Sequence, residues 1–150
     1  MVYLLDTNIP ITLSRHPVFS NFLRKKYGCN LNEDSVFLSI ITLGEINAII
    51  KKQSLGDRRI DVLKRVTATT TILPINKDQI IAAYGTLDAY SQGKLDPVDF
   101  TSRNMGKNDP WIAATAAVSD LPLITTDKDF DHLQGSYLDV RYVDLNEFTP

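Results

Sequence analysis

Four acidic side chains hold comparable places in this chain, each where an apolar, strand-like run gives way to a helix-like segment. They are Asp6, Glu45, Asp109 and Asp127. In an open α/β sheet, the carboxyl ends of parallel strands and the helix starts that follow them line one crevice, so these acids are expected to meet there. Clustered carboxylates repel one another unless a cation lies among them. The pattern therefore predicts a catalytic site holding Mg²⁺ or Mn²⁺, and with it metal-dependent phosphodiester chemistry.

Two of these acids also have a purely structural interpretation as helix caps. Glu45 follows Thr42 at the spacing of a capping box, in which the glutamate returns to the threonine amide. Asp109 precedes Pro110 as an N-cap precedes a proline at the first helical position. Either role would account for the acid without any metal.

The other two acids fit local turns. Asp127 can cap the turn that follows its strand, and Asp6 can form an Asx turn with Asn8. Serine, threonine, asparagine or glycine would serve as well at a cap, whereas all four junctions carry an acid. Capping alone does not require four converging anions, and a divalent ion does.

Zinc fits the sequence poorly. No histidine stands at a suitable spacing, and His16 and His132 are interpreted as surface or packing residues. Cys29 is the only cysteine, which excludes an intrachain disulfide and fits a reducing cytoplasm. The apolar start before Asp6 is too short for a signal-peptide core, and the most apolar stretch, residues 36–50, carries Glu45. We expect a cytoplasmic protein without a membrane span.

The length and net charge of the chain limit its domain number and the ways in which it can bind nucleic acid. A chain of 150 residues with 43% hydrophobic and 23% charged residues is expected to form one domain, residues 1–150. The formal net charge is only −2, so contact with nucleic acid must depend on a metal or on local basic patches. The candidate patches are residues 24–26, 51–52, 58–59 and 64–65.

Hydrophobic patterning alternates between the two kinds of element. Strands are expected over residues 2–5, 36–40, 69–75, 121–126 and 140–143. Helices are expected after Asn8, with an interruption at 16–17, over 19–27, from about 43 to before Gly56, briefly over 60–66, and over 78–92, 109–119 and 130–133. This alternation predicts an α/β domain with a central parallel sheet of four to five strands flanked by helices. Residues 94–107 form the longest loop-like segment.

Four motifs, in order, resemble those of the PIN-domain family and are close to the VapC-type toxins of bacterial toxin–antitoxin pairs. They are residues 4–9, 39–46, 108–116 and 125–130, and the resemblance covers nearly the whole chain. It implies that the four acids hold Mg²⁺ or Mn²⁺, with Asn8 and Thr126 as polar neighbours that orient them. Asp129 either supports the metal or is a capping residue at the protein surface. Three further acids match no motif position and are interpreted as solvated: Asp96, Asp99 and Asp131.

The same resemblance implies a biology. VapC-like toxins are endoribonucleases that hydrolyse RNA, are inhibited by a cognate VapB-like antitoxin, commonly form homodimers, and reach DNA only through the antitoxin. An antitoxin groove is one interpretation of the apolar residues of the first helices, and ordinary core is the other: Ile9, Leu13, Phe19 and Phe22. Lys51, Lys52 and Lys107 are candidates to hold phosphates beside the site.

Two rival functions remain at this point. Residues 4–8 resemble the opening of aspartyl-phosphate phosphatases, which use an aspartate nucleophile. Those enzymes need a second acid two residues later, where this chain has Asn8, and they leave Glu45 unexplained. The other rival is a catalytically silent PIN protein that acts within an antitoxin-bound DNA-regulatory complex.

Overall fold

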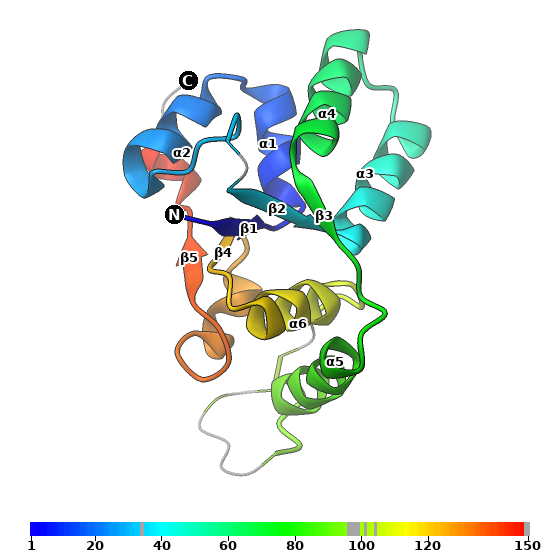
Figure 1. The fold of residues 1–150 in the computed structure, drawn as a ribbon, viewed down its shortest axis with the longest axis vertical. Coiled ribbons are helices and arrows are strands. Elements are labelled where there is room, and N and C mark those ends of the chain that lie inside the picture. The colour runs from blue at the N-terminus through cyan, green and yellow to red at the C-terminus, as the bar shows by residue number, and fades with distance from the viewer. Residues whose placement is uncertain (34, 96–99, 101, 104, 149–150) are drawn as a thin grey trace.

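A five-stranded, all-parallel sheet forms the centre of the computed structural model (Figure 1). The structure describes residues 1–33, 35–95, 100, 102–103 and 105–148. The strands are β1 (Tyr3–Leu5), β2 (Val36–Ser39), β3 (Thr71–Leu73), β4 (Leu123–Thr125) and β5 (Val140–Tyr142), in the spatial order β3-β2-β1-β4-β5. The chain moves outward from β1 to β3 on one side and then returns to place β4 and β5 on the other. The order therefore reverses between β1 and β4, where an open α/β sheet has its binding crevice.

The register brings three strand ends to one level. Leu5, the last residue of β1, pairs with Leu38 of β2 on one side and with Ile124 of β4 on the other. The residues that follow these strands consequently emerge at the same edge of the sheet. This alignment fixes where side chains distant in sequence can meet.

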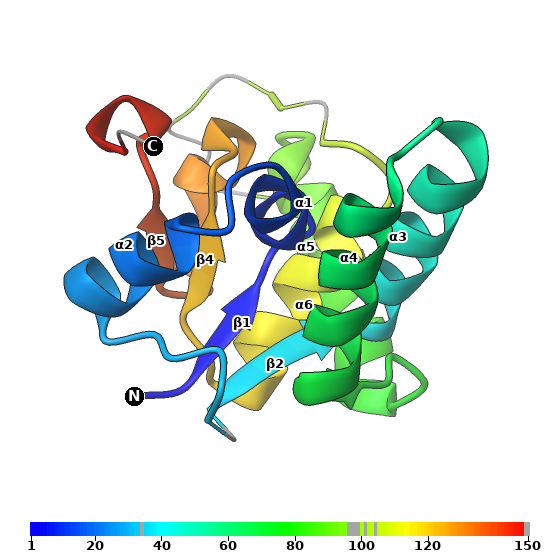
Figure 2. The ribbon, with the colours of Figure 1, turned by 90° about the horizontal axis from the view of Figure 1, so that it is seen from above.

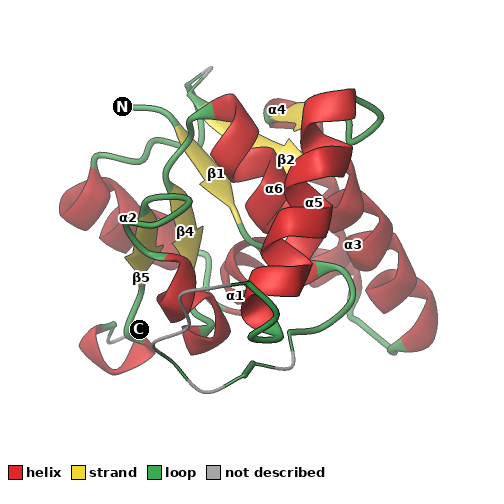
Figure 3. Ribbon diagram, turned by 90° about the horizontal axis from the view of Figure 1, so that it is seen from below, coloured by secondary structure: helices red, strands yellow, loops and turns green. Residues whose placement is uncertain are grey.

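Helices cover both faces of the sheet. They are α1 (Asn8–Arg15), α2 (Phe19–Tyr27), α3 (Ile40–Lys52), α4 (Asp57–Thr69), α5 (Asp78–Ser91) and α6 (Asp109–Ser119), with the 3₁₀ helices η1 (Lys128–Leu133) and η2 (Leu145–Glu147). Figure 2 looks onto the face covered by α1, α2 and α4, and Figure 3 looks from the opposite side, where α5 and α6 lie. The α3 helix packs beside α4 (Figure 1).

The central strand is buried from both sides, as its apolar sequence requires. Tyr3 and Leu5 join the core beneath α1 and α2, whereas Leu4 joins the core formed with α6 and η1. Successive side chains of a strand point to opposite faces, so this split follows from the pleat. Strands of a parallel sheet that is buried on both faces have nearly continuous apolar sequences, and β1 has such a sequence.

The predicted fold class is confirmed, and the predicted elements differ from the observed ones mainly at their ends. The segment expected to be a short helix over 60–66 is the thirteen-residue α4, so β3 begins at Thr71 rather than at Thr69. The hydroxyl of Thr69 donates to the carbonyl of Arg65 at 3.0 Å, and that of Thr70 to the carbonyl of Val66 at 2.8 Å. These bonds let β-branched residues complete a helix instead of starting a strand.

The groove suggested on the first helices is wrong, because those residues are core. Ile9 and Phe19 are fully buried, and Leu13 is 3% exposed. Phe22 stacks on Phe19, and Phe148 from the C-terminal segment packs edge-on against both rings. The apolar face of α1 and α2 is therefore covered by the chain itself.

The two histidines pack against aromatic rings, in line with their interpretation from sequence. His16 lies edge-on to Phe148, and His132 lies parallel to the ring of Tyr90. His132 Nε2 is also 2.6 Å from the hydroxyl oxygen of Ser91.

Three acids were interpreted as solvated. Asp131 is exposed, and Asp96 and Asp99 lie outside the described residues. Within the part of the chain that the structure describes, no helix is both long and apolar enough to cross a membrane.

Candidate active site

Asp6 follows β1 directly and is held from two sides. It is 4% exposed. The backbone N–H of Thr7 donates to Oδ1 at 2.8 Å, and the hydroxyl of Thr125 at the end of β4 donates to Oδ2 at 2.7 Å. These bonds replace the predicted Asx turn with Asn8, because Thr7 and Thr125 are the donors that the strand ends bring to the carboxylate.

Burial dominates the chemistry of this carboxyl group. Removal from water raises the pKa of Asp6 to about 6, although the hydrogen bonds from Thr125 and Thr7 act to lower it. The charges of Asp127 and Glu45 raise it further. Asp6 is therefore close to other acids despite their separation in sequence.

Glu45 lies in the second turn of α3 and does not cap that helix. Ser39 is the N-cap, and its hydroxyl oxygen accepts from the backbone N–H of Ile41 at 3.1 Å. The capping-box interpretation with Thr42 is thus wrong, because the helix begins three residues earlier than that motif requires. The side chain of Glu45 is left to reach across to the turn between β1 and α1, where Oε1 accepts from the hydroxyl of Thr7 at 2.7 Å.

The Thr7 hydroxyl joins two elements through a single proton. It lies 2.9 Å from the hydroxyl oxygen of Thr42, which is fully buried in α3. A hydroxyl has one proton to donate and can also accept. With that proton given to the Glu45 carboxylate, Thr7 must accept from Thr42, which fixes the orientation of all three side chains.

Asp127 combines a cap with a place at the site. It is the N-cap of η1, and its Oδ1 accepts from the backbone N–H of Asp129 at 2.8 Å, so the predicted cap is confirmed. Its own backbone N–H donates to the hydroxyl oxygen of Thr125 at 3.0 Å. Thr125 therefore connects Asp6 to the start of η1, whereas the neighbouring Thr126 is half-buried outside this chain of bonds.

Asp109 is the first residue of α6 rather than its N-cap. Asn108 precedes it in the cap position, and Pro110 stands at the second helical position, so the predicted N-cap is wrong by one residue. Burial is the largest effect that raises the pKa of Asp109, to about 7. The next effects are the negative charges of the acids around it, which are Asp6, Asp127, Glu45 and Asp129. These effects on Asp109 indicate that the four predicted acids lie near one another.

The remaining supporting residues lie at the edge of the site. Asn8 is exposed at the first position of α1, and Asp129 is exposed on η1 while its charge still acts on Asp109. The motifs assigned no role to Thr7 or Thr125 and indicated Thr42 only as a helix cap. The available signal was a hydroxyl side chain at the end of a buried strand, where it must find a polar partner.

The donor set suits a divalent ion in kind. All four side chains offer carboxylate oxygens, and two of them have raised pKa values that a bound cation would relieve. Across the described ranges, however, no three acids, histidines or cysteines are gathered closely enough to hold an ion together. The structure thus has the ligand chemistry of a divalent-metal site but not its closed geometry.

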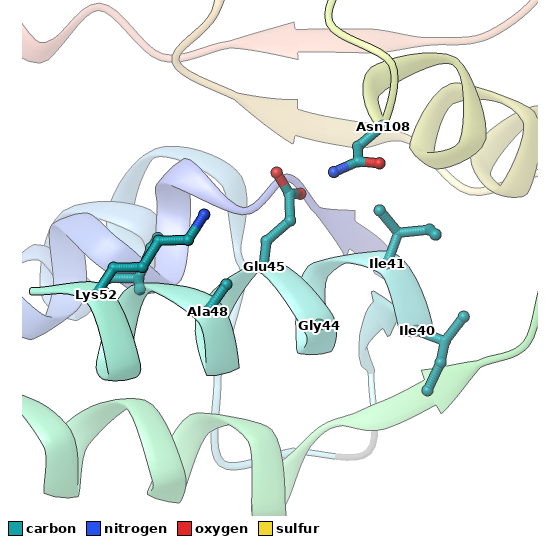
Figure 4. A pocket seen from close by; sticks show the side chains of 8 residues that line it. Ile40, Ile41, Gly44, Glu45, Ala48, Lys52 and Asn108 are labelled. Carbon is teal, nitrogen blue, oxygen red and sulfur yellow. The ribbon is translucent and has the colours of Figure 1, made fainter.

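A groove of about 480 Å³ runs along α3 beside these acids (Figure 4). Glu45 stands within it and faces Asn108 at the start of α6, while Lys52 lies at one end and Ile41 toward the other. The groove is open to solvent and continuous with the acidic site through Glu45. A ligand strand placed there would reach the acids.

Comparison with known proteins gives the class. The profile of the PIN-domain family matches residues 3–136, which is most of the chain. The chain belongs to the PIN-domain family, and the resemblance stated from its motifs is confirmed. No curated protein matches it.

Several solved structures share the fold. VapBC2 from Rickettsia felis, bound to a DNA fragment from their promoter, has a TM-score of 0.74 at 22% identity and covers 96% of this chain and 100% of its own. VapBC-1 from nontypeable Haemophilus influenzae has a TM-score of 0.67 at 27% identity and covers 95% of this chain and 98% of its own. VapBC-5 from Mycobacterium tuberculosis, a member of a toxin–antitoxin family, has a TM-score of 0.64 at 26% identity, with 95% and 98% covered.

Proposed function

We propose that this protein is a Mg²⁺- or Mn²⁺-dependent endoribonuclease that acts in the cytoplasm as the VapC-like toxin of a toxin–antitoxin pair. The observation that carries the proposal is the convergence of Asp6, Glu45, Asp109 and Asp127 at the switch point of a PIN fold. Likeness to toxin–antitoxin complexes supports the toxin role. The aspartyl-phosphate alternative has no place for Glu45, which this arrangement uses.

In this mechanism the four carboxylates would hold the ion. A bound divalent ion lowers the pKa of a water molecule and stabilises charge on the phosphate under attack. Asp6 and Glu45 are held in position by the hydroxyls of Thr125 and Thr7, so they serve as fixed ligands. Preset ligands spare the reaction the cost of ordering them.

Asp109 is the best candidate to accept the proton of the attacking water. Unlike Asp6, its carboxylate has no hydrogen-bond donor among the described residues. It can therefore take up a proton without breaking an existing bond.

We further propose that a VapB-like antitoxin inhibits the enzyme, that the toxin forms a homodimer, and that contact with DNA occurs through the antitoxin. Two of the similar structures are VapBC proteins bound to DNA, from Rickettsia felis and Salmonella typhimurium. A cluster of mutually repelling carboxylates also offers an antitoxin a place for a basic side chain.

The test is cleavage of a mixed tRNA and rRNA pool by antitoxin-free protein with Mg²⁺, Mn²⁺ or EDTA. We expect metal-dependent cutting that is absent from Asp109→Asn, which keeps the size of the side chain and removes its charge. Equal cutting by that variant would indicate a contaminating nuclease. Absence of cutting by folded protein would favour the catalytically silent alternative within a DNA-regulatory complex.

A further inference from the structure

Lys52 shares one stripe of α3 with Glu45. It lies seven residues later in the chain, which in a helix corresponds to two turns and about 10 Å along the axis. Both side chains line the groove, and Figure 4 shows the Lys52 amine on the same side of α3 as the Glu45 carboxylate. A positive charge therefore stands beside the acidic site at a fixed distance along the groove.

The structure distinguishes Lys52 from the two other lysines that were candidates for phosphate binding. Lys51, its neighbour in the same helix, is exposed as Lys52 is but does not line the groove. Lys107 is exposed beside Asn108 and does not line it either. Spacing on the helix decides this, because adjacent residues point about 100° apart around the axis.

The Lys52 amine is available for a ligand. The ion pairs found among the described residues join Lys26 to Glu147 and Arg141 to Asp139. Glu45 lies two turns away on the same stripe, and the salt bridges of the described residues do not join it to Lys52. The fold thus gives this charge no partner within those residues.

Gly44 provides an independent observation in the same groove. It lies inside α3, where glycine is about 1 kcal/mol less favourable than alanine. A Cβ placed there would meet no atom within 4 Å, so packing does not exclude alanine. Because Gly44 is exposed and lines the groove, its missing side chain leaves room for a ligand close to the helix.

We propose that Lys52 binds a backbone phosphate of the RNA strand near the scissile one, and that Gly44 lets the strand lie against α3. This inference rests on the proposed ribonuclease function and assigns a positioning residue to it. Lys and Arg side chains provide much of the affinity for a phosphate backbone, and with a net charge of −2 the protein must rely on a few well-placed basic residues. Ala48 lines the groove between Glu45 and Lys52, and Ile41 lines it on the other side of Glu45.

The test measures RNA binding separately from cleavage. Fluorescence anisotropy with a labelled single-stranded RNA is recorded in Mg²⁺ over a series of salt concentrations, in an Asp109→Asn background that prevents cutting. Loss of one phosphate contact on a single strand lowers the slope of log affinity against log salt by about 0.7. We expect this change, with a three- to ten-fold loss of affinity at low salt, for Lys52→Gln. The matched Lys51→Gln should keep the original slope.

A slope unchanged by Lys52→Gln, or absence of RNA binding by folded protein, would overturn the assignment and leave the groove to an antitoxin tail or a second copy of the chain. The cleavage assay tests the nuclease proposal separately from this binding assay. If RNA binds with the expected dependence on Lys52 but the unmodified protein never cuts, the phosphate contact stands and the nuclease proposal does not.

Gly44→Ala tests the second part of the inference. Alanine should raise the melting temperature, since the methyl group meets open space and favours the helix. RNA affinity should fall at least three-fold, because the same methyl group narrows the track. A more stable variant with unchanged affinity would remove Gly44 from the proposal.

Discussion

Asp6 and Asp109 are two carboxyl groups in one site that the fold treats differently. Asp6 is almost fully buried and accepts two hydrogen bonds at 2.7 and 2.8 Å. Asp109 is half-buried at the start of α6 and is surrounded by the charges of other acids. The pKa nevertheless rises to about 6 for Asp6 and to about 7 for Asp109.

The less buried group has the higher pKa because hydrogen bonds compensate Asp6 and not Asp109. Donors from Thr7 and Thr125 stabilise the charged form of Asp6 against its burial. For Asp109, burial and repulsion by the neighbouring acids both raise the pKa. Hydrogen bonds thus stabilise the charged form of Asp6, whereas the charged form of Asp109 has no such support.

The largest expected effect is on catalysis, where the two acids should look alike. Asp6→Asn and Asp109→Asn should each lower the rate of RNA cleavage by about 100-fold or more, since each removes a metal ligand or the proton acceptor. Single-turnover cleavage in Mg²⁺ measures this. The isosteric change Asn8→Asp, outside the hydrogen-bond network, should retain more activity than either. A fully active Asp6→Asn would break the assignment of the site.

The next largest effect is on stability and concerns Thr125, which donates a hydrogen bond to Asp6. Thr125→Val removes a buried hydroxyl that donates to Asp6 and accepts from Asp127, so it should destabilise the protein by about 1–3 kcal/mol. Denaturant unfolding measures the loss. The matched control Thr126→Val, one residue later, should change stability by less than about 0.5 kcal/mol. Equal effects would show that the network has no special importance.

The pH dependence of stability should have an unusual sign. The pKa values of Asp6 and Asp109 in the folded protein lie above their ordinary 3.8, so the folded state keeps protons that the unfolded state has lost. The melting temperature of metal-free protein should therefore rise as pH falls from 8 toward 5. That stability is lost as pH rises through about 6 to 7.

A variant serves as the control for this pH effect. His132, whose pKa burial lowers, acts in the opposite direction and destabilises the fold when pH falls below about 6.5. The double variant Asp6→Asn, Asp109→Asn should therefore lose the rise on acidification and keep the fall. A rise that persists in the double variant would assign it to other groups.

The smallest effect concerns Asp109 alone. In EDTA at pH 8, Asp109→Asn should raise the melting temperature by a few degrees, because it removes a repelled charge without removing a hydrogen bond. Asp6→Asn should not, because the amide cannot accept both bonds from Thr7 and Thr125. Thermal unfolding of the two variants side by side checks this, and stabilisation by both would contradict the contrast.

Local sequence was informative wherever one segment decides its own structure. The bounds of α6, Asp109–Ser119, agree with the helix expected from its alanine-rich pattern. The apolar runs located all five strands and their parallel arrangement, with ends displaced by one or two residues. The helix caps were less accurate, because Ser39 and Thr42 are both good N-caps and the local pattern does not choose between them.

The sequence by itself determined the fold class and the family and predicted the four acids, because hydrophobic periodicity and short motifs depend on near neighbours along the chain. Only the tertiary structure decided how those acids are held. The bonds of Thr7 to Glu45 and of Thr125 to Asp6 span 38 and 119 residues and exist because β1, β2 and β4 end at one level. The selection of Lys52 over Lys51 likewise depends on which face of α3 lies toward α6. Packing sets these relations, and no local pattern encodes them.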